Sequence, residues 1–324
     1  SISSKGSFWK MKEENLKYKF KIKNAKKPSQ KKIKKTLGRT LKSFNVLYAY
    51  AMFIFHWTGL KYFAVFILNV IQKFFIVQYL EKFHIIHIPV KRVDHKLDSK
   101  IPFKPEFAQC YLDFVNYWIR PMCMTMKRYG SFEGIKLSAE YVRYMIMLYK
   151  EAYKIYSHCL TTTVRPNPTT KATKGIQFWD PHYLCVPSLH IAIVVLTIGF
   201  YKILFEREEF TEPEKDQWNS ELYTHGIEIA ESVLYMKQHS VNCISAAIYM
   251  VTKTAPELLT EEMSIDFIDS MFKDSIYVEK TDSKEITSYI KKMYKDLMEE
   301  SRNSDDWTSP LKEWLKNYKI QAQN

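Results

Sequence analysis

The sequence predicts an all-α protein, with a bundle of about six core helices, a basic N-terminal arm and a helical C-terminal extension. Hydrophobic residues make up 46% of the 324 residues, which is enough for a sizeable core, whereas only 8 glycines and 12 prolines are present. Architectures rich in β-turns need more of both residues, so the long apolar stretches favour helices. We place the arm at residues 1–43, the core at 44–252 and the extension at 253–324.

The arm carries the whole excess of positive charge. It holds 15 of the 48 Lys and Arg residues but two of the 35 Asp and Glu residues, which leaves 33 of each sign elsewhere. A basic face on the neutral body is therefore not expected. The arm itself suits an anionic membrane surface, with nucleic acid as the alternative partner. Because the arm lacks the apolar segment of a signal peptide, we expect a membrane-associated or cytoplasmic protein that is not secreted.

Two apolar stretches organise the core. Phe44–Leu60 is an uncharged run of 17 residues, which only just reaches the length of a membrane span. A core helix or a helix lying on a membrane surface is the alternative. The mean hydropathy of −0.29 is low for a protein with six spans, so a peripheral or single-span arrangement is equally consistent. The second stretch is Leu184–Tyr201, where Pro187 predicts a helix over Ser188–Phe205 with His190 in its first turn.

The remaining elements follow from periodicity and composition. We expect a connector at 88–106, helices at 107–130 and 138–160, a loop at 161–186 and a charged loop at 206–218. Helices should then cover Glu221–Met236 and 240–252. The extension reads as a solvated helical cap over the core, with a partner-binding module as the alternative. Its helically spaced apolar residues are Ile286, Ile290, Met293, Tyr294 and Leu297.

Cysteine and histidine spacing does not indicate a metal centre. The five cysteines are odd in number and form no Cys-x-x-Cys pair, so neither a disulfide framework nor a zinc ribbon is predicted. His84, His87 and His95 lack an acidic partner at convincing spacing, and we interpret them as interfacial or core side chains. We therefore expect no metal and no cofactor.

Three segments carry residues suited to chemistry: Thr161–Pro166, Asp180–Ala192 and Ser232–His239. Each is weak alone. In this order they resemble the three signature segments of the type-2 phosphatidic acid phosphatase superfamily, in its inositol-phosphoryl-transfer-like branch. The resemblance lies in Thr-x-x-x-Arg-Pro, Pro-Ser-Leu-His-x-Ala and Ser-x-x-x-x-Lys-Gln-His, and it covers about residues 139–252. Arg165 precedes His190 by 25 residues, and His190 precedes His239 by 49, which suits loop-to-helix junctions that meet at one end of a bundle.

The resemblance implies a phosphatase or phosphotransferase that acts on a phosphate monoester or lipid phosphate without a metal. It implies that His239 is the nucleophile, forming a phosphohistidine, and that His190 is the acid. The transferring group is anionic, so catalysis needs positioning and positive charge. Arg165 can hold two phosphate oxygens, Lys237 offers a point charge, and Ser188 and the free N–H groups of its helix are neutral donors.

The third segment departs from the family pattern. Cys243 stands where the family has the Asp that orients the nucleophilic ring, and Ser240 replaces a Tyr. In the first segment, Leu160 replaces a Pro. A neutral thiol neither fixes the imidazole tautomer strongly nor stabilises an imidazolium. The alternatives are therefore a catalytically degenerate helical scaffold or interaction protein whose arm binds nucleic acid or an anionic membrane, and a sensor of lipid phosphates.

Overall fold

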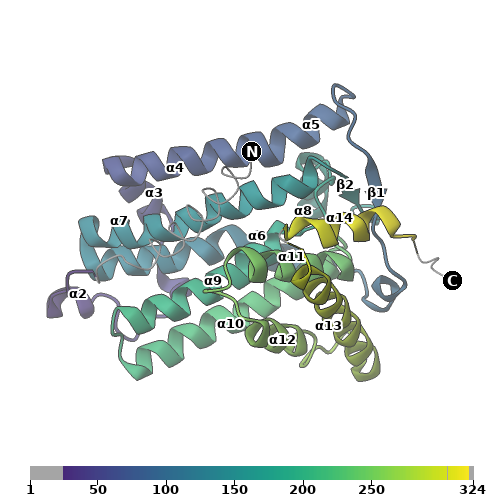
Figure 1. The fold of residues 1–324 in the computed structure, drawn as a ribbon. Coiled ribbons are helices and arrows are strands. Elements are labelled where there is room, and N and C mark those ends of the chain that lie inside the picture. The colour runs from purple at the N-terminus through teal and green to yellow at the C-terminus, as the bar shows by residue number, and fades with distance from the viewer. Residues whose placement is uncertain (1–24, 305, 321–324) are drawn as a thin grey trace.

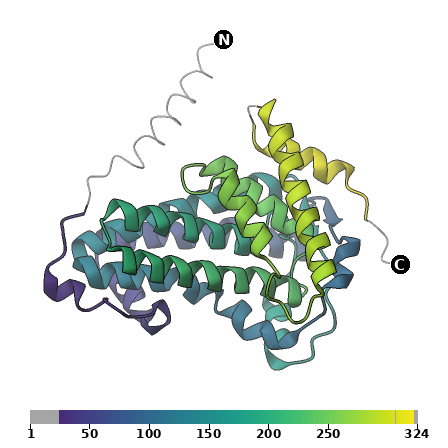
Figure 2. The ribbon, with the colours of Figure 1, turned by 90° about the horizontal axis from the view of Figure 1, so that it is seen from below.

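Helices dominate the computed structural model, which describes residues 25–304 and 306–320. The chain is 70% helical and 2% strand, so the all-α prediction is confirmed. Three long helices form the centre: α7 (Phe114–Tyr156), α9 (Leu189–Arg207) and α10 (Glu212–Tyr235). Figures 1 and 2 show α9 and α10 running side by side along α7. The central helix α9 is apolar on all sides, as expected of a helix enclosed by others.

The first apolar run forms two helices instead of one span. α3 (Leu47–Phe55) ends at His56, whose backbone is extended, and α4 (Trp57–Val70) begins at the next residue. Gly59 lies against the backbone of Phe53, where a Cβ would approach to 2.8 Å, so this glycine permits the sharp reversal. The predicted span over Phe44–Leu60 is therefore interrupted. Beyond α4 the helix continues through the π-helical η2 (Ile71–Ile76) into α5 (Val77–Lys82).

Among the residues that the structure describes, two continuous helices are long and apolar enough to cross a membrane by length and composition. They are Trp57–Lys82, of which 22% is buried in its most apolar window, and Leu189–Arg207, of which 72% is buried. The second is the central helix α9. The first lies along the outside of α7 and is the uppermost helix in Figure 1.

The two helices predicted at 107–130 and 138–160 correspond to the two arms of α7, which fold back on each other so that the rings of Trp118 and Tyr141 are 6.4 Å apart. The chain enters through η4 (Pro105–Phe107) and α6 (Ala108–Leu112), and α7 then runs to Tyr156. Gly130 has a φ of 84°, a conformation that strains other residues, and it marks the bend inside α7. The predicted break is therefore present, but it is confined to the turn at Gly130, and residues 131–137 are helical.

Two predicted loops contain regular structure. The loop at 161–186 holds the end of β2 (Leu160–Thr162) and α8 (Lys171–Trp179), which Thr170 and Thr173 open with reciprocal hydrogen bonds. The charged loop at 206–218 contains the first turns of α10, because Thr211 and Glu214 form a capping box there. The connector at 88–106 contributes β1 (Val90–Arg92) and η3 (Lys96–Lys100).

The C-terminal extension packs against the core through α13 (Lys280–Arg302). Ile286, Ile290 and Tyr294 are fully buried, and α13 lies against α11 (Val241–Thr254). The short helices α12 (Glu261–Ser270) and α14 (Thr308–Asn317) flank it, as Figure 2 shows. The helical spacing predicted for this segment is thus correct, and its apolar face covers α11.

The described part of the basic arm, residues 25–43, also contacts the core. It includes α2 (Gln30–Ile33) and η1 (Leu41–Ser43), and the backbone N–H of Leu41 donates to Glu221 at 2.6 Å. The indole N–H of Trp218 donates to the carbonyl of Arg39 at 2.9 Å. This stretch therefore differs from the flexible arm predicted for residues 1–43. Residues 1–24 lie outside the described residues.

Candidate functional site

A short parallel pairing joins the first and second signature segments. β2 pairs with β1 on one side and forms a bridge between Thr161 and Leu184 on the other. The N–H of Thr161 donates to the carbonyl of Tyr183 at 2.9 Å, and the N–H of Cys185 donates back to Thr161 at 3.2 Å. The Thr161 hydroxyl also accepts the N–H of Val186 at 2.7 Å. These bonds fix the chain that leads into α9.

Ser188 and His190 occupy the N-terminus of α9, as predicted. Ser188 is the N-cap, and its Oγ lies 3.5 Å from the N–H of Ile191 and 3.2 Å from Nε2 of His239. The rings of His190 and His239 are 5.6 Å apart, centre to centre, and meet edge to face. The two predicted catalytic histidines and Ser188 therefore come together where the free N–H groups and dipole of α9 favour an anion.

The turn after α10 positions His239. Lys237 is in the left-handed conformation with a φ of 53°, its N–H donates to Leu234, and the next N–H donates to Val233. This is the Schellman pattern of helix ends. The turn directs the ammonium of Lys237 to the carbonyls of Asp98 and Ile101. Lys237 is therefore occupied at η3 and does not face the histidine pair, in contrast to its predicted phosphate-binding role.

Arg165 links the first and third segments. Its guanidinium donates to Oε1 of Gln238 at 3.4 Å and to the carbonyl of Asp180 at 3.2 Å. The Asp180 carboxylate is 4.0 Å from the same guanidinium. Arg165 thus lies beside the residue that precedes His239, close to the site, although it contributes no surface to the cavity that the histidines line.

That cavity has a volume of about 320 Å³ and combines a polar end with an apolar wall. The polar side chains are Asp180, His182, His190 and His239. The wall comes from α4, η2, α6, α7, α8 and α9, and His190 stacks on one of its rings, that of Tyr111, with ring centres 4.9 Å apart. The apolar side chains include Val70, Phe74, Phe75, Phe114, Trp179 and Ile193. The cavity is therefore shaped for a ligand with an anionic group and an apolar body.

Both predicted catalytic histidines are neutral at pH 7. Burial lowers the pKa of His190 to about 4. Burial, followed by repulsion from His190 and His182, also lowers the pKa of His239 well below its ordinary value. A neutral imidazole has the lone pair that a nucleophile needs. The acid role of His190, in contrast, requires a proton that the free site does not hold.

His239 lacks the orienting partner that a nucleophilic histidine normally has. Within residues 25–304 and 306–320, its Nδ1 is buried without a hydrogen bond, although the backbone of Cys185 lies beside the ring. The sulfur of Cys243 accepts the N–H of Ser240 at 3.3 Å and closes the cap of α11. Asn242 binds Val93, Tyr289 and Tyr318 instead. Neither residue orients the His239 ring.

His182 is a site residue to which the sequence analysis gave no role. It adopts a φ of 67°, and its Nε2 hydrogen-bonds to Thr163 Oγ1 at 2.8 Å, while Nδ1 lies 3.7 Å from the Asp180 carboxylate. Burial alone would lower the pKa of His182, but the Cys185 sulfur and the Asp180 carboxylate raise it to about 9. His182 is therefore a buried cation in the cavity at neutral pH, and it supplies the positive charge that was predicted to come from Lys237.

The three histidines considered for a metal centre do not converge. His84 and His87 are exposed, whereas His95 is buried and stacks on Tyr289 with ring centres 3.9 Å apart. No family model, curated protein or solved structure matches the chain. The functional assignment of the cavity therefore depends on its own residues and chemistry.

Proposed function

We propose that this protein transfers phosphoryl groups from phosphate monoesters, in particular lipid phosphates, through a phosphohistidine at His239. The observation that carries this proposal is the meeting of His239, His190 and Ser188 at the N-terminus of α9, within one cavity. A neutral nucleophile, a second imidazole and a set of free N–H donors are the parts that such a reaction requires.

The reaction has two half-steps. A neutral ring nitrogen of His239 attacks phosphorus, the bond from phosphorus to the ester oxygen breaks, and that oxygen takes a proton from His190. A water molecule then attacks the phosphohistidine, gives a proton to His190 and leaves inorganic phosphate with a free His239. An acceptor alcohol in place of water gives a transferase. Neither half-step needs a metal ion, because Arg165 and His182 supply positive charge.

Substrate binding accounts for the proton that His190 needs. A dianionic phosphate within a few ångströms favours the charged form of an imidazole and raises its pKa. His182 remains protonated and offsets the negative charge of the phosphate. The reaction should therefore prefer dianionic monoesters over uncharged phosphate triesters, because a triester has no negative charge to raise the pKa of His190.

The surroundings of the cavity support a lipid phosphate as substrate. Val70, Phe74 and Phe75 belong to the continuous helix Trp57–Lys82, and all three line the cavity. The outer face of the same helix exposes large apolar side chains at Leu60, Val65, Ile67, Leu68, Ile71 and Ile76. Such a continuous apolar face suits the interface of a lipid bilayer. A lipid from that surface could enter the cavity with its phosphate group at the polar end and its apolar chain against the wall.

One observation supports the alternative that the site is catalytically degenerate: within the described part of the chain, Nδ1 of His239 meets only the backbone of Cys185 and makes no hydrogen bond of normal geometry. Cys243 is engaged in the cap of α11, and among the described residues no carboxylate hydrogen-bonds to the His239 ring. Loss of an orienting carboxylate lowers turnover about 10⁴-fold in serine proteases. In this alternative the same cavity binds phosphate without cleaving it.

The test is release of inorganic phosphate from an aryl phosphate and from phosphatidic acid in detergent micelles, with EDTA present. We expect turnover by the wild-type protein, loss of at least about 10³-fold in His239→Ala, and no change in His158→Ala, a matched histidine exposed at the end of α7. Retained turnover in His239→Ala would refute the proposal. Phosphate binding without turnover by the wild-type protein would favour the degenerate alternative.

A further inference from the structure

A second group of chemically active side chains lies on the other side of α6 from the histidine pair. Cys110 and Tyr111 are neighbours in α6, but Tyr111 stacks on His190, whereas Cys110 belongs to a cluster with α10. One ligand atom each of Cys110, His225 and Glu228 lies within 4.8 Å of the other two. His225 and Glu228 are three residues apart, so they share one face of α10.

We propose that Cys110, His225 and Glu228 form a zinc-binding site. Thiolate, imidazole and carboxylate are the ligands that Zn²⁺ prefers, and a thiolate excludes the hard cations Mg²⁺ and Ca²⁺. In a tetrahedral site with bonds of about 2.0–2.3 Å, ligand atoms lie roughly 3.3–3.8 Å apart. Small rotations of side chains within the 4.8 Å group reach this geometry.

The histidine is already oriented for this role. Nδ1 of His225 faces Glu228 at 2.7 Å, and Nε2 faces the Asp113 carboxylate at 2.9 Å. Asp113 is itself held by two hydrogen bonds from Arg120, at 2.6 and 2.7 Å, and by Asn116 at 2.9 Å. A fixed carboxylate behind one ring nitrogen is the arrangement that turns the other nitrogen toward a metal. We therefore assign Nδ1 as the ligand atom.

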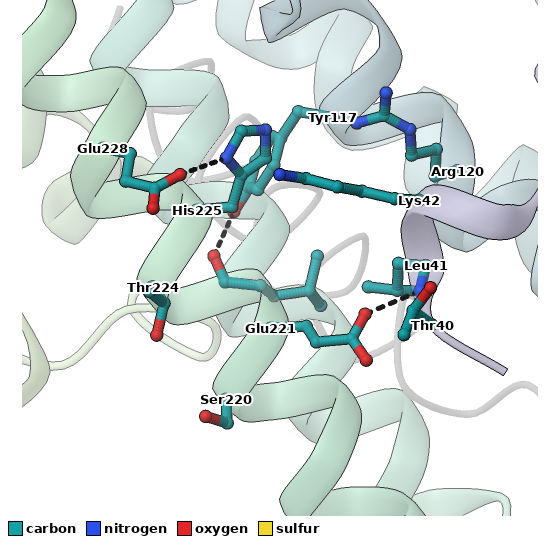
Figure 3. A pocket seen from close by; sticks show the side chains of 11 residues that line it. Thr40, Leu41, Lys42, Tyr117, Arg120, Ser220, Glu221, Thr224, His225 and Glu228 are labelled. Atoms are coloured by element: carbon teal, nitrogen blue, oxygen red, sulfur yellow. Dashed lines mark hydrogen bonds and ion pairs between the residues drawn. The ribbon is translucent and has the colours of Figure 1, made fainter. Parts of the chain in front are cut away.

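The open coordination position would face a pocket. His225 and Glu228 line a cavity of about 390 Å³ together with Lys42 and Arg120, and Figure 3 shows these side chains around it. The Lys42 ammonium lies near two of these side chains, because its charge acts on the pKa of both Glu228 and Cys110. Three protein ligands beside a pocket that also contains a lysine and an arginine suit a zinc ion that binds a small anion, such as phosphate or a carboxylate, at its fourth position.

The test uses the full chain and the metal alone. Co²⁺ titration, which reports thiolate ligation by a charge-transfer absorption band, should show one site in the wild-type protein. The band should disappear in Cys110→Ser and persist in Cys159→Ser, which removes a buried thiol elsewhere. Zn²⁺ affinity, measured by competition with a chromogenic chelator, should fall at least about 10-fold in Asp113→Asn, because the second carboxylate orients the imidazole.

Glu228 is the proposed zinc ligand whose substitution should leave the fold intact, because its side chain is half exposed. Glu228→Gln should therefore keep the circular dichroism spectrum and bind Zn²⁺ at least about 10-fold more weakly. The matched control is Glu221→Gln, which lines the same pocket outside the cluster and should bind Zn²⁺ normally. Absence of a stoichiometric Co²⁺ band in the wild-type protein, or an equal band in Cys110→Ser, would overturn the proposal.

Discussion

Replacement of His182 by glutamine should make the stability of this protein less dependent on pH. In the folded chain the Cys185 sulfur and the Asp180 carboxylate raise the pKa of His182 from 6.5 to about 9. The folded state therefore holds a proton that the unfolded state releases, and this stabilisation is full below pH 6.5 and lost as the pH rises through about 9. At about 1.4 kcal/mol per pKa unit, up to about 2.5 kcal/mol disappears between pH 7 and pH 10.

The assay is chemical denaturation of wild-type protein and His182→Gln at pH 7 and pH 10, with the free energies of unfolding compared. The gap between the two proteins should shrink by about 2 kcal/mol over this range. His190→Gln is the matched control, because burial lowers the pKa of His190 to about 4 and its proton does not change there. A gap for His182→Gln that is equal at both pH values would refute the assignment of His182 as a buried cation.

Three further outcomes concern the scaffold that holds the site. Arg128→Met should lower the free energy of unfolding by about 3–5 kcal/mol, because it leaves the buried carboxylate of Glu214 without its cation. Denaturant titration should show that the double variant Arg128→Met/Glu214→Met regains most of this loss. Gly199→Ala should destabilise by about 1–3 kcal/mol in the same assay, because its Cβ would overlap the carbonyl of Leu258. Gly175→Ala, which has open space within α8, should instead raise the thermal midpoint by the equivalent of up to about 1 kcal/mol, and a decrease would show that α8 is not helical there.

Residues within or next to a helix determine where many of these helices begin and end, so their positions could be predicted from the sequence. Pro187 and Ser188 begin α9 within one residue of the predicted start, because an N-cap and a proline act on their own turn. The start of α10 was missed, although Thr211, Pro213 and Glu214 carry a capping-box pattern that local reasoning could have used. The reversal at His56 was not readable, since it depends on the close approach of α3 and α4.

The candidate site likewise contains residues that the sequence predicts and residues whose roles depend on the fold. His190, His239 and Ser188 converge as the segment pattern predicted, because each follows a junction between a loop and a helix. Lys237 could not be placed, since the direction of its side chain depends on a left-handed backbone and on carbonyls about 140 residues earlier in the chain. His182 was overlooked because the charge of an imidazole depends on Asp180 and on burial, which only the fold supplies.

The most direct test of the proposed chemistry is the covalent intermediate itself. Wild-type protein is mixed with an aryl phosphate, quenched in alkali, which preserves phosphohistidine, and examined by intact-mass and fragment mass spectrometry. The proposal predicts one added phosphoryl group, located on His239, and none in His239→Ala. A phosphoryl group on any other residue, or turnover with no protein-bound phosphate in the wild type, would contradict it.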